Sequence, residues 1–123
     1  MSTPDEIVAA ELQRLSAAFV SQLPEQVQAI EKEAMAWLSA PRDAERYEVL
    51  SHRVHQLKGS GSTFGCPGIS RVARLFEQRI AEYRQELEAG RLPAAEDVES
   101  AMAELQNEAR RVRTQSGDPE ASP

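Results

Sequence analysis

The chain has 123 residues, enough for one domain with a hydrophobic core, and a formal net charge of −6 at pH 7. Ala, Leu, Glu, Gln and Arg dominate and aromatic residues make up only 5%, a mixture that favours an all-helical fold. The negative net charge argues against a nucleic-acid partner. The apolar runs are too short to span a membrane, and the first residues do not resemble a secretory signal.

Two helices are predicted in the first third of the chain. Residues 5–22 follow Thr3-Pro4, a plausible helix start, and their apolar positions recur every three to four residues: Val8, Leu12, Leu15 and Phe19. Pro24 is expected to break or kink this helix, because it lacks an N–H and clashes with the preceding turn. A second helix then covers residues 24–39.

Three further helices follow a connection in which Asp43 is a candidate N-cap. The first begins near Ala44 and enters a glycine-rich stretch, with a core stripe of Tyr47, Leu50, Val54, Leu57 and Gly61. A turn is predicted at residues 65–68, and the last two helices are predicted at about residues 69–89 and 95–114.

Short loops between long helices make sequence neighbours antiparallel. We therefore expect an all-α fold over residues 5–114, an antiparallel up-and-down four-helix bundle with an additional N-terminal helix. Residues 115–123 are predicted to be a disordered C-terminal tail, because they are short, polar and rich in turn-forming residues. A monomer is the simplest expectation.

The stretch VLSHRVHQLKGSGSTFG, residues 49–65, breaks a local rule, because it places two glycines where a helix prefers Ala or Leu. His55 follows core residue Val54 and should face solvent, with Lys58 and Gly59 on the same face one turn later. An imidazole is a good nucleophile near neutral pH, a lysine can neutralise a phosphoryl oxygen, and a glycine leaves room for a partner. This combination predicts a phosphoryl acceptor at His55.

Charge supports this interpretation. Residues 42–91 hold nine basic and seven acidic residues, whereas the remainder holds five and thirteen. The basic share therefore surrounds His55, which suits a phosphoryl group or an acidic partner. A solvated surface of mixed charge is the alternative.

The same stretch also suggests other roles for its residues. His52 and His55 form an i,i+3 pair, but two histidines with no third ligand nearby make a weak case for a metal site. Gly61 lies on the core stripe, where close helix packing explains it. Cys66 is the single cysteine, so no internal disulfide is expected; a reducing cytoplasm and a small buried residue are the simplest interpretation.

The segment His55-Gln56-Leu57-Lys58-Gly59-Ser60 resembles the signature of histidine phosphotransfer (HPt) domains. Ser62-Thr63-Phe64-Gly65 is similar to the phosphoacceptor (P1) domain of chemotaxis histidine kinases. The resemblance implies that His55 is phosphorylated at Nε2 and that Lys58 and Gly59 match conserved neighbours. It also implies a Glu or Gln on the next helix that hydrogen-bonds Nδ1, and alignment without a gap places Glu77 there.

The function implied by the resemblance is that of a phosphorelay intermediate in two-component signalling. His55 would accept a phosphoryl group from a receiver-domain aspartate and pass it to another receiver. The partners would be response-regulator receivers and a (hybrid) histidine kinase, without nucleic acid or membrane. No cofactor and no kinase activity are expected, because the sequence lacks a glycine-rich loop with GK[ST]. The alternatives are the phosphoacceptor domain of a chemotaxis-type kinase, a non-catalytic helical adaptor, and a metal- or cofactor-binding bundle.

Overall fold

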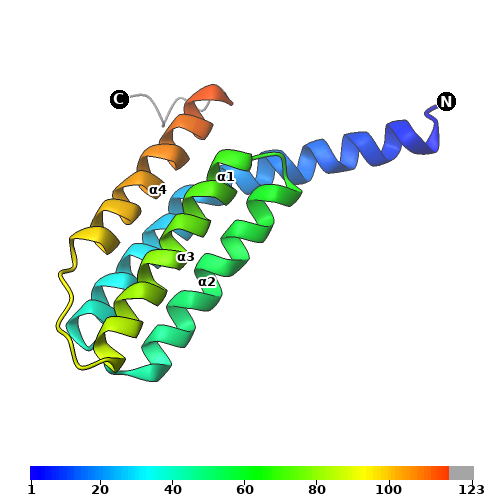
Figure 1. Cartoon of the computed structure of the whole chain (residues 1–123). Helices are drawn as coiled ribbons and strands as arrows, with labels where there is room; N and C mark the ends of the chain where they lie inside the picture. The colour runs from blue at the N-terminus through cyan, green and yellow to red at the C-terminus, as the bar shows by residue number, and fades with distance from the viewer. Residues whose placement is uncertain (117–123) are drawn as a thin grey trace.

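Residues 1–116 are described by the structure, a computed structural model. This part of the chain holds four helices and no strands: α1 (Pro4–Ser39), α2 (Ala44–Thr63), α3 (Pro67–Glu88) and α4 (Glu96–Gln115). Helices α1 and α3 each contact both α2 and α4, so the four helices form a square bundle (Figure 1). The predicted all-α helical bundle is confirmed. None of these helices is long and apolar enough to cross a membrane.

The prediction of an additional, separate N-terminal helix is wrong. Residues 5–22 and 24–39 belong to one helix, α1, which contains Pro24 in its interior. An interior proline costs about 3 kcal/mol. Leu23 and Val27, on either side of it, are buried in the core, and each fully buried side chain of this kind contributes about 1.5–3 kcal/mol. Packing of both neighbours therefore outweighs the loss of one backbone hydrogen bond.

The first half of α1 extends beyond the end of the bundle, and we call residues 4–18 the arm (Figure 1). Its start is a capping box, since the Thr3 hydroxyl accepts from the Glu6 N–H and the Glu6 carboxylate accepts from the Thr3 N–H. Phe19 is the first buried residue of α1, and its ring lies 5.5 Å from that of Phe64. The predicted stripe positions before Phe19 are therefore outside the core.

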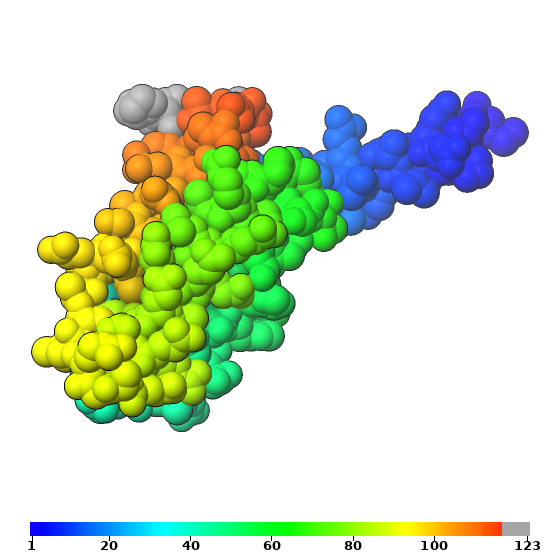
Figure 2. Space-filling view, viewed as in Figure 1, coloured from blue at the N-terminus to red at the C-terminus, as the bar shows by residue number. Residues whose placement is uncertain are grey.

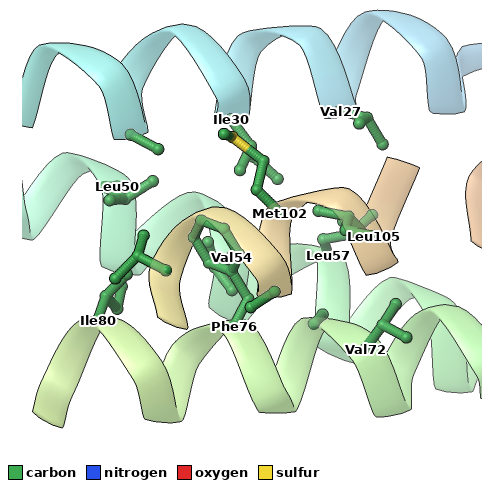
Figure 3. Packing of buried hydrophobic residues seen from close by; sticks show 14 of the residues in the cluster. Val27, Ile30, Leu50, Val54, Leu57, Val72, Phe76, Ile80, Met102 and Leu105 are labelled. Atoms are coloured by element: carbon green, nitrogen blue, oxygen red, sulfur yellow. The ribbon is translucent and has the colours of Figure 1, made fainter. Parts of the chain in front are cut away.

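The core lies between the four helices (Figure 3), and besides its aliphatic side chains it holds the aromatic rings of Trp37, Phe76 and Tyr83. Of the core stripe predicted for α2, Leu50, Val54, Leu57 and Gly61 are buried, whereas Tyr47 is only partly buried against the core. In α3 the buried stripe is Ile69, Val72, Phe76, Ile80, Tyr83 and Leu87. In α4 it is Val98, Met102, Leu105 and Ala109.

The loop between α2 and α3 sets these two helices side by side. Gly65 has φ +74°, which an L side chain rarely adopts, and the next N–H, of Cys66, donates to the Gly61 carbonyl at 2.8 Å. Pro67 and Gly68, predicted in the turn, instead open α3, because a proline at the first helical position loses no hydrogen bond. The resulting tight hairpin brings the middle of α2 against the middle of α3.

The start of α2 and the end of α4 lie close to where the sequence predicts them. Asp43 is the N-cap of α2, as predicted, and its carboxylate accepts from the Glu45 and Arg46 N–H groups. Gln115, placed in the predicted tail, is the last residue of α4. The rest of that tail, residues 117–123, lies outside the described residues.

Candidate functional site

His55 lies on the outward face of α2, next to buried Val54. Its side chain is 66% exposed, so a partner can reach the ring. The Nδ1 atom of this ring lies 3.0 Å from Glu77 Oε2 on α3. The structure therefore brings together the histidine and the glutamate that lie 22 residues apart in the sequence.

Glu77 is held by two donors. Its Oε1 accepts a hydrogen bond from Lys58 Nζ at 2.8 Å, while its Oε2 meets His55. The Glu77 and Lys58 side chains are 27% and 25% exposed, so the ion pair is partly shielded from water. Phe76, the neighbour of Glu77 on α3, is fully buried and fixes this turn of the helix against α2.

The carboxylate determines the tautomer of His55. Partial burial is the largest single influence and raises the pKa of Glu77, but the hydrogen bonds and the positive charges of Lys58 and His55 together bring the net pKa below the ordinary value. Glu77 is therefore ionised at neutral pH and can only accept hydrogen bonds. The proton must lie on Nδ1, which leaves the Nε2 lone pair free and directed away from α3.

The two glycines of α2 have different surroundings. A Cβ at Gly59 would meet nothing within 4 Å, apart from its own helix backbone, so the surface beside His55 is open. A Cβ at Gly61 would lie 2.9 Å from the Ser70 backbone nitrogen and 3.1 Å from the Cys66 carbonyl oxygen. Gly61 thus permits close packing of α2 on α3, in agreement with the sequence interpretation.

A groove between α1 and α2 adjoins this surface. It has a volume of about 670 Å³ and is lined by the apolar residues Ile30, Leu57 and Phe64 and by polar side chains such as Gln26 and Gln56. Gly59 lies on its wall, and Arg53, also on the wall, is paired with Glu33 at 2.6 Å. This groove could not be predicted from the sequence, since it depends on how α1 and α2 pack.

The Lys58–Glu77 ion pair was also missed. The sequence assigned each residue to His55 separately, Lys58 for its position on the same helix face and Glu77 by resemblance. The pairing of Lys58 with Glu77 could nevertheless have been predicted, because opposite charges on facing turns of neighbouring antiparallel helices are close enough to pair. All four predicted site residues lie on one surface formed by α2 and α3.

The other candidate chemistry lies away from this surface. Cys66 is buried at the start of α3, and burial together with the nearby Glu108 carboxylate raises the pKa of its thiol. A thiol of this kind stays protonated and unreactive at neutral pH. Among residues 1–116 no group of three or more His, Cys, Asp or Glu side chains is arranged to hold a metal ion.

A sequence model of the Hpt domain matches residues 14–115, most of the chain. The chain therefore belongs to the Hpt domain family, whose members carry out histidine phosphotransfer in two-component phosphorelays. Hpt domains are phosphocarriers rather than kinases, and they interact with receiver domains and histidine kinases. Comparison with curated proteins and with solved structures gave no match.

Proposed function

We propose that His55 is the residue that carries the phosphoryl group, accepting it from the aspartyl phosphate of one receiver domain and passing it to the aspartate of another. The observation that carries this proposal is the 3.0 Å contact between His55 Nδ1 and Glu77. It leaves Nε2, the outward nitrogen, as the nucleophile. His52, the other histidine of α2, takes no part in the proposed transfer.

The transfer needs no proton movement on this chain. The Nε2 lone pair attacks phosphorus, the N–P bond forms, and the P–O bond to the receiver's aspartate breaks to release its carboxylate. The imidazole ring becomes positively charged in the product, and its Nδ1–H continues to donate to the Glu77 carboxylate, which stabilises that charge. The reverse sequence, with an incoming carboxylate as nucleophile, unloads His55.

Lys58 and Gly59 support the same step. Lys58 Nζ is a positive point charge one turn from His55, where it donates to Glu77 and can neutralise an oxygen of a phosphoryl group at Nε2. Gly59 leaves the approach to the ring free of a side chain. Since phosphoryl transfer depends mainly on positioning and electrostatics, a partner that brings the metal ion and the reacting phosphate can supply the rest.

The whole helical bundle takes part in the proposed function, as the unit on which the receiver domains dock. Residues 5–114 act as a single phosphotransfer unit without an ATP site of its own, and a receiver docks transiently on the surface around His55, next to the α1–α2 groove. Weak, short-lived docking suits a carrier that serves two partners in turn. The cytoplasmic location favoured by the single cysteine remains a prediction.

The chain offers a matched pair of variants for the test, because its two histidines lie on the same helix, one turn apart. A receiver domain is loaded with radiolabelled acetyl phosphate and mixed with wild type, His55→Gln or His52→Gln. We expect label on wild type and on His52→Gln, and none on His55→Gln. The label should be lost in acid and kept in base, as expected for a phosphorus–nitrogen bond.

Two results would contradict the assignment. Label that persists on His55→Gln would move the acceptor elsewhere. Acid-stable label on wild type would mean that an oxygen, rather than the imidazole nitrogen, carries the phosphoryl group. Circular dichroism of both variants checks that the helices are intact.

A further inference from the structure

Two arginines of α3 have no carboxylate partner. Arg71 and Arg74 are exposed, and neither side chain takes part in an ion pair or hydrogen bond within residues 1–116. The other arginines of this helix, Arg79 and Arg84, are both paired with glutamates. Arg71 and Arg74 lie one turn apart on the same helix, so they concentrate positive charge at one place in a chain whose formal net charge is −6. These two residues are called the arginine pair below.

The arginine pair lies beside the phosphotransfer surface along the α2–α3 hairpin. The contact between His55 and Glu77 sets the register of these two helices, which run in opposite directions. Lys58 follows His55 by three residues and Arg74 precedes Glu77 by three, so Lys58 and Arg74 lie level with each other. Each helical residue advances about 1.5 Å, which puts Arg74 about 4.5 Å and Arg71 about 9 Å along α3 from Glu77.

The arginine pair also faces the solvent on the same side of the molecule as His55. Glu77 lies on the side of α3 that meets α2. Three residues along a helix turn a side chain by about 60° from the full turn, so Arg74 points outward beside the α2–α3 contact and Arg71 points farther out. Figure 2 shows α2 and α3 as one continuous face, with the arm projecting to the side without covering it.

A protein that reaches the Nε2 atom of His55 is large enough to cover the arginine pair as well. Weak, transient complexes bury up to about 1,200 Å² in total, or about 600 Å² on each partner, which corresponds to a circle of about 14 Å radius. The axes of packed helices are about 8–10 Å apart. A contact patch of this size centred on His55 therefore extends over α3 to Arg74 and Arg71.

The reacting face of such a partner is acidic by its chemistry. It presents an aspartyl phosphate, and a divalent cation that assists the transfer is held in proteins by carboxylates. Guanidinium groups bind phosphate and carboxylate oxygens in a fixed geometry. We propose that the arginine pair attracts and orients the acidic face of the receiver domain, so that the docking surface extends from His55 across α3. This docking role rests on the proposed transfer to His55 and adds to it the residues that guide the partner.

The two roles have different kinetic consequences. Attraction between exposed charges speeds the encounter of two proteins and is screened by salt. Once the receiver is bound, the rate of transfer depends on the groups at the imidazole, Glu77 and Lys58. Loss of the arginine pair should therefore raise the KM for the receiver and leave kcat unchanged.

The test compares two double variants of the full chain that change the net charge equally. One is Arg71→Gln with Arg74→Gln. The control is Arg42→Gln with Arg110→Gln, which alters two exposed arginines of the α1–α2 connection and α4 that also lack an ion pair within residues 1–116. The donor is the phosphorylated receiver domain that labels wild type, at several concentrations. We expect the first variant to lower kcat/KM roughly tenfold in dilute buffer, through KM, and the difference to vanish at about 0.5 M salt. The control should stay within about twofold of wild type.

A small donor separates docking from chemistry. Phosphoramidate has no docking surface, and its phosphoryl group passes to the imidazole nitrogen as its own phosphorus–nitrogen bond breaks and ammonia leaves. Both double variants should react with it at the wild-type rate, and circular dichroism should show their helices intact. Equal loss in the two double variants, no loss in either, or a loss that persists in high salt or with phosphoramidate would overturn the docking role. Label that persists on His55→Gln would instead contradict the transfer to His55.

Discussion

Glu77 is the residue that links the parts of the site, because its two carboxylate oxygens face two different side chains of α2. One oxygen meets His55 Nδ1 and the other accepts from Lys58 Nζ. The same carboxylate therefore sets the tautomer of the imidazole and holds the lysine ready beside it. Its two functions, in transfer and in stability, can be measured separately.

We expect Glu77→Ala to slow phosphorylation of His55 without abolishing it. A hydrogen bond to a charged group contributes about 1.5–3 kcal/mol, so its loss should reduce the rate by roughly tenfold or more. The measurement is the initial rate of label transfer from a loaded receiver domain. Glu82→Ala is the matched control, since Glu82 lies on the same helix and pairs with Arg79 away from the site. Equal rates for wild type and Glu77→Ala would remove Glu77 from the reaction.

The lowered pKa of Glu77 also predicts a pH dependence of stability. A carboxyl whose pKa is lower in the folded protein stabilises the fold above its unfolded pKa, here near 4.5, and this contribution is lost as the pH falls through the folded pKa. Wild type should therefore exceed Glu77→Gln in free energy of unfolding at about pH 6, by up to about 1 kcal/mol, and the difference should shrink as the pH is lowered below about 4.5. Urea unfolding at a series of pH values measures it. A difference that grows on acidification would have the wrong sign.

The α2–α3 hairpin is the element that builds the site, and its two helices pack closely at Gly61. Beside this glycine, the hydroxyls of Ser62 and Ser70 lie 2.9 Å apart across the helix pair. The approach fixes the rotation of α2 relative to α3 and so places His55 opposite Glu77. A change of packing at Gly61 would move the site even though Gly61 does not touch it.

Alanine at the two glycines should have opposite effects on stability. Gly59→Ala should raise the free energy of unfolding by about 0.5–1 kcal/mol, because the added methyl meets only open space and alanine favours the helix. Gly61→Ala should lower it by about 1–3 kcal/mol, because the methyl would press on backbone atoms of the α3 start. Chemical unfolding of both variants against wild type tests the pair. Effects of the same sign would show that the packing distance between α2 and α3 is not limiting.

Much of the hairpin could be predicted from the sequence, because its determinants are local. The core stripes of α2 and α3 follow helical spacing, and the Asp43 cap and the Gly65 turn have their own residue signatures. His55 and Lys58 were found for the same reason, since both lie on one helix. Glu77 was placed by resemblance, and the Lys58–Glu77 bond and the α1–α2 groove require the packed helices.

The error at α1 has a different origin. Pro24 is a strong local signal for a helix end, yet Leu23 and Val27 keep the helix continuous through contacts with residues distant in the sequence. The spacing of Val8, Leu12 and Leu15 correctly predicted a helical stripe, but spacing alone does not say what covers a stripe. Only the lengths of α2, α3 and α4 show that the bundle ends near Phe19.

At the scale of the whole molecule, the arm and the phosphotransfer surface are separate. The arm leaves the bundle at the end where α2 meets α3 (Figure 1), whereas His55 is exposed on α2 near the middle of that helix.

Helix α1 also combines two levels of stability in one element. From Phe19 onward one face of the helix is buried among the other helices, and unwinding it requires opening the bundle. Before Phe19 the backbone is stabilised mainly by its own hydrogen bonds. The helix can therefore melt from its free end and reform while the site stays intact. Any partner that binds the arm must offset the conformational entropy lost when this segment becomes helical. Binding of that partner is therefore coupled to helix formation.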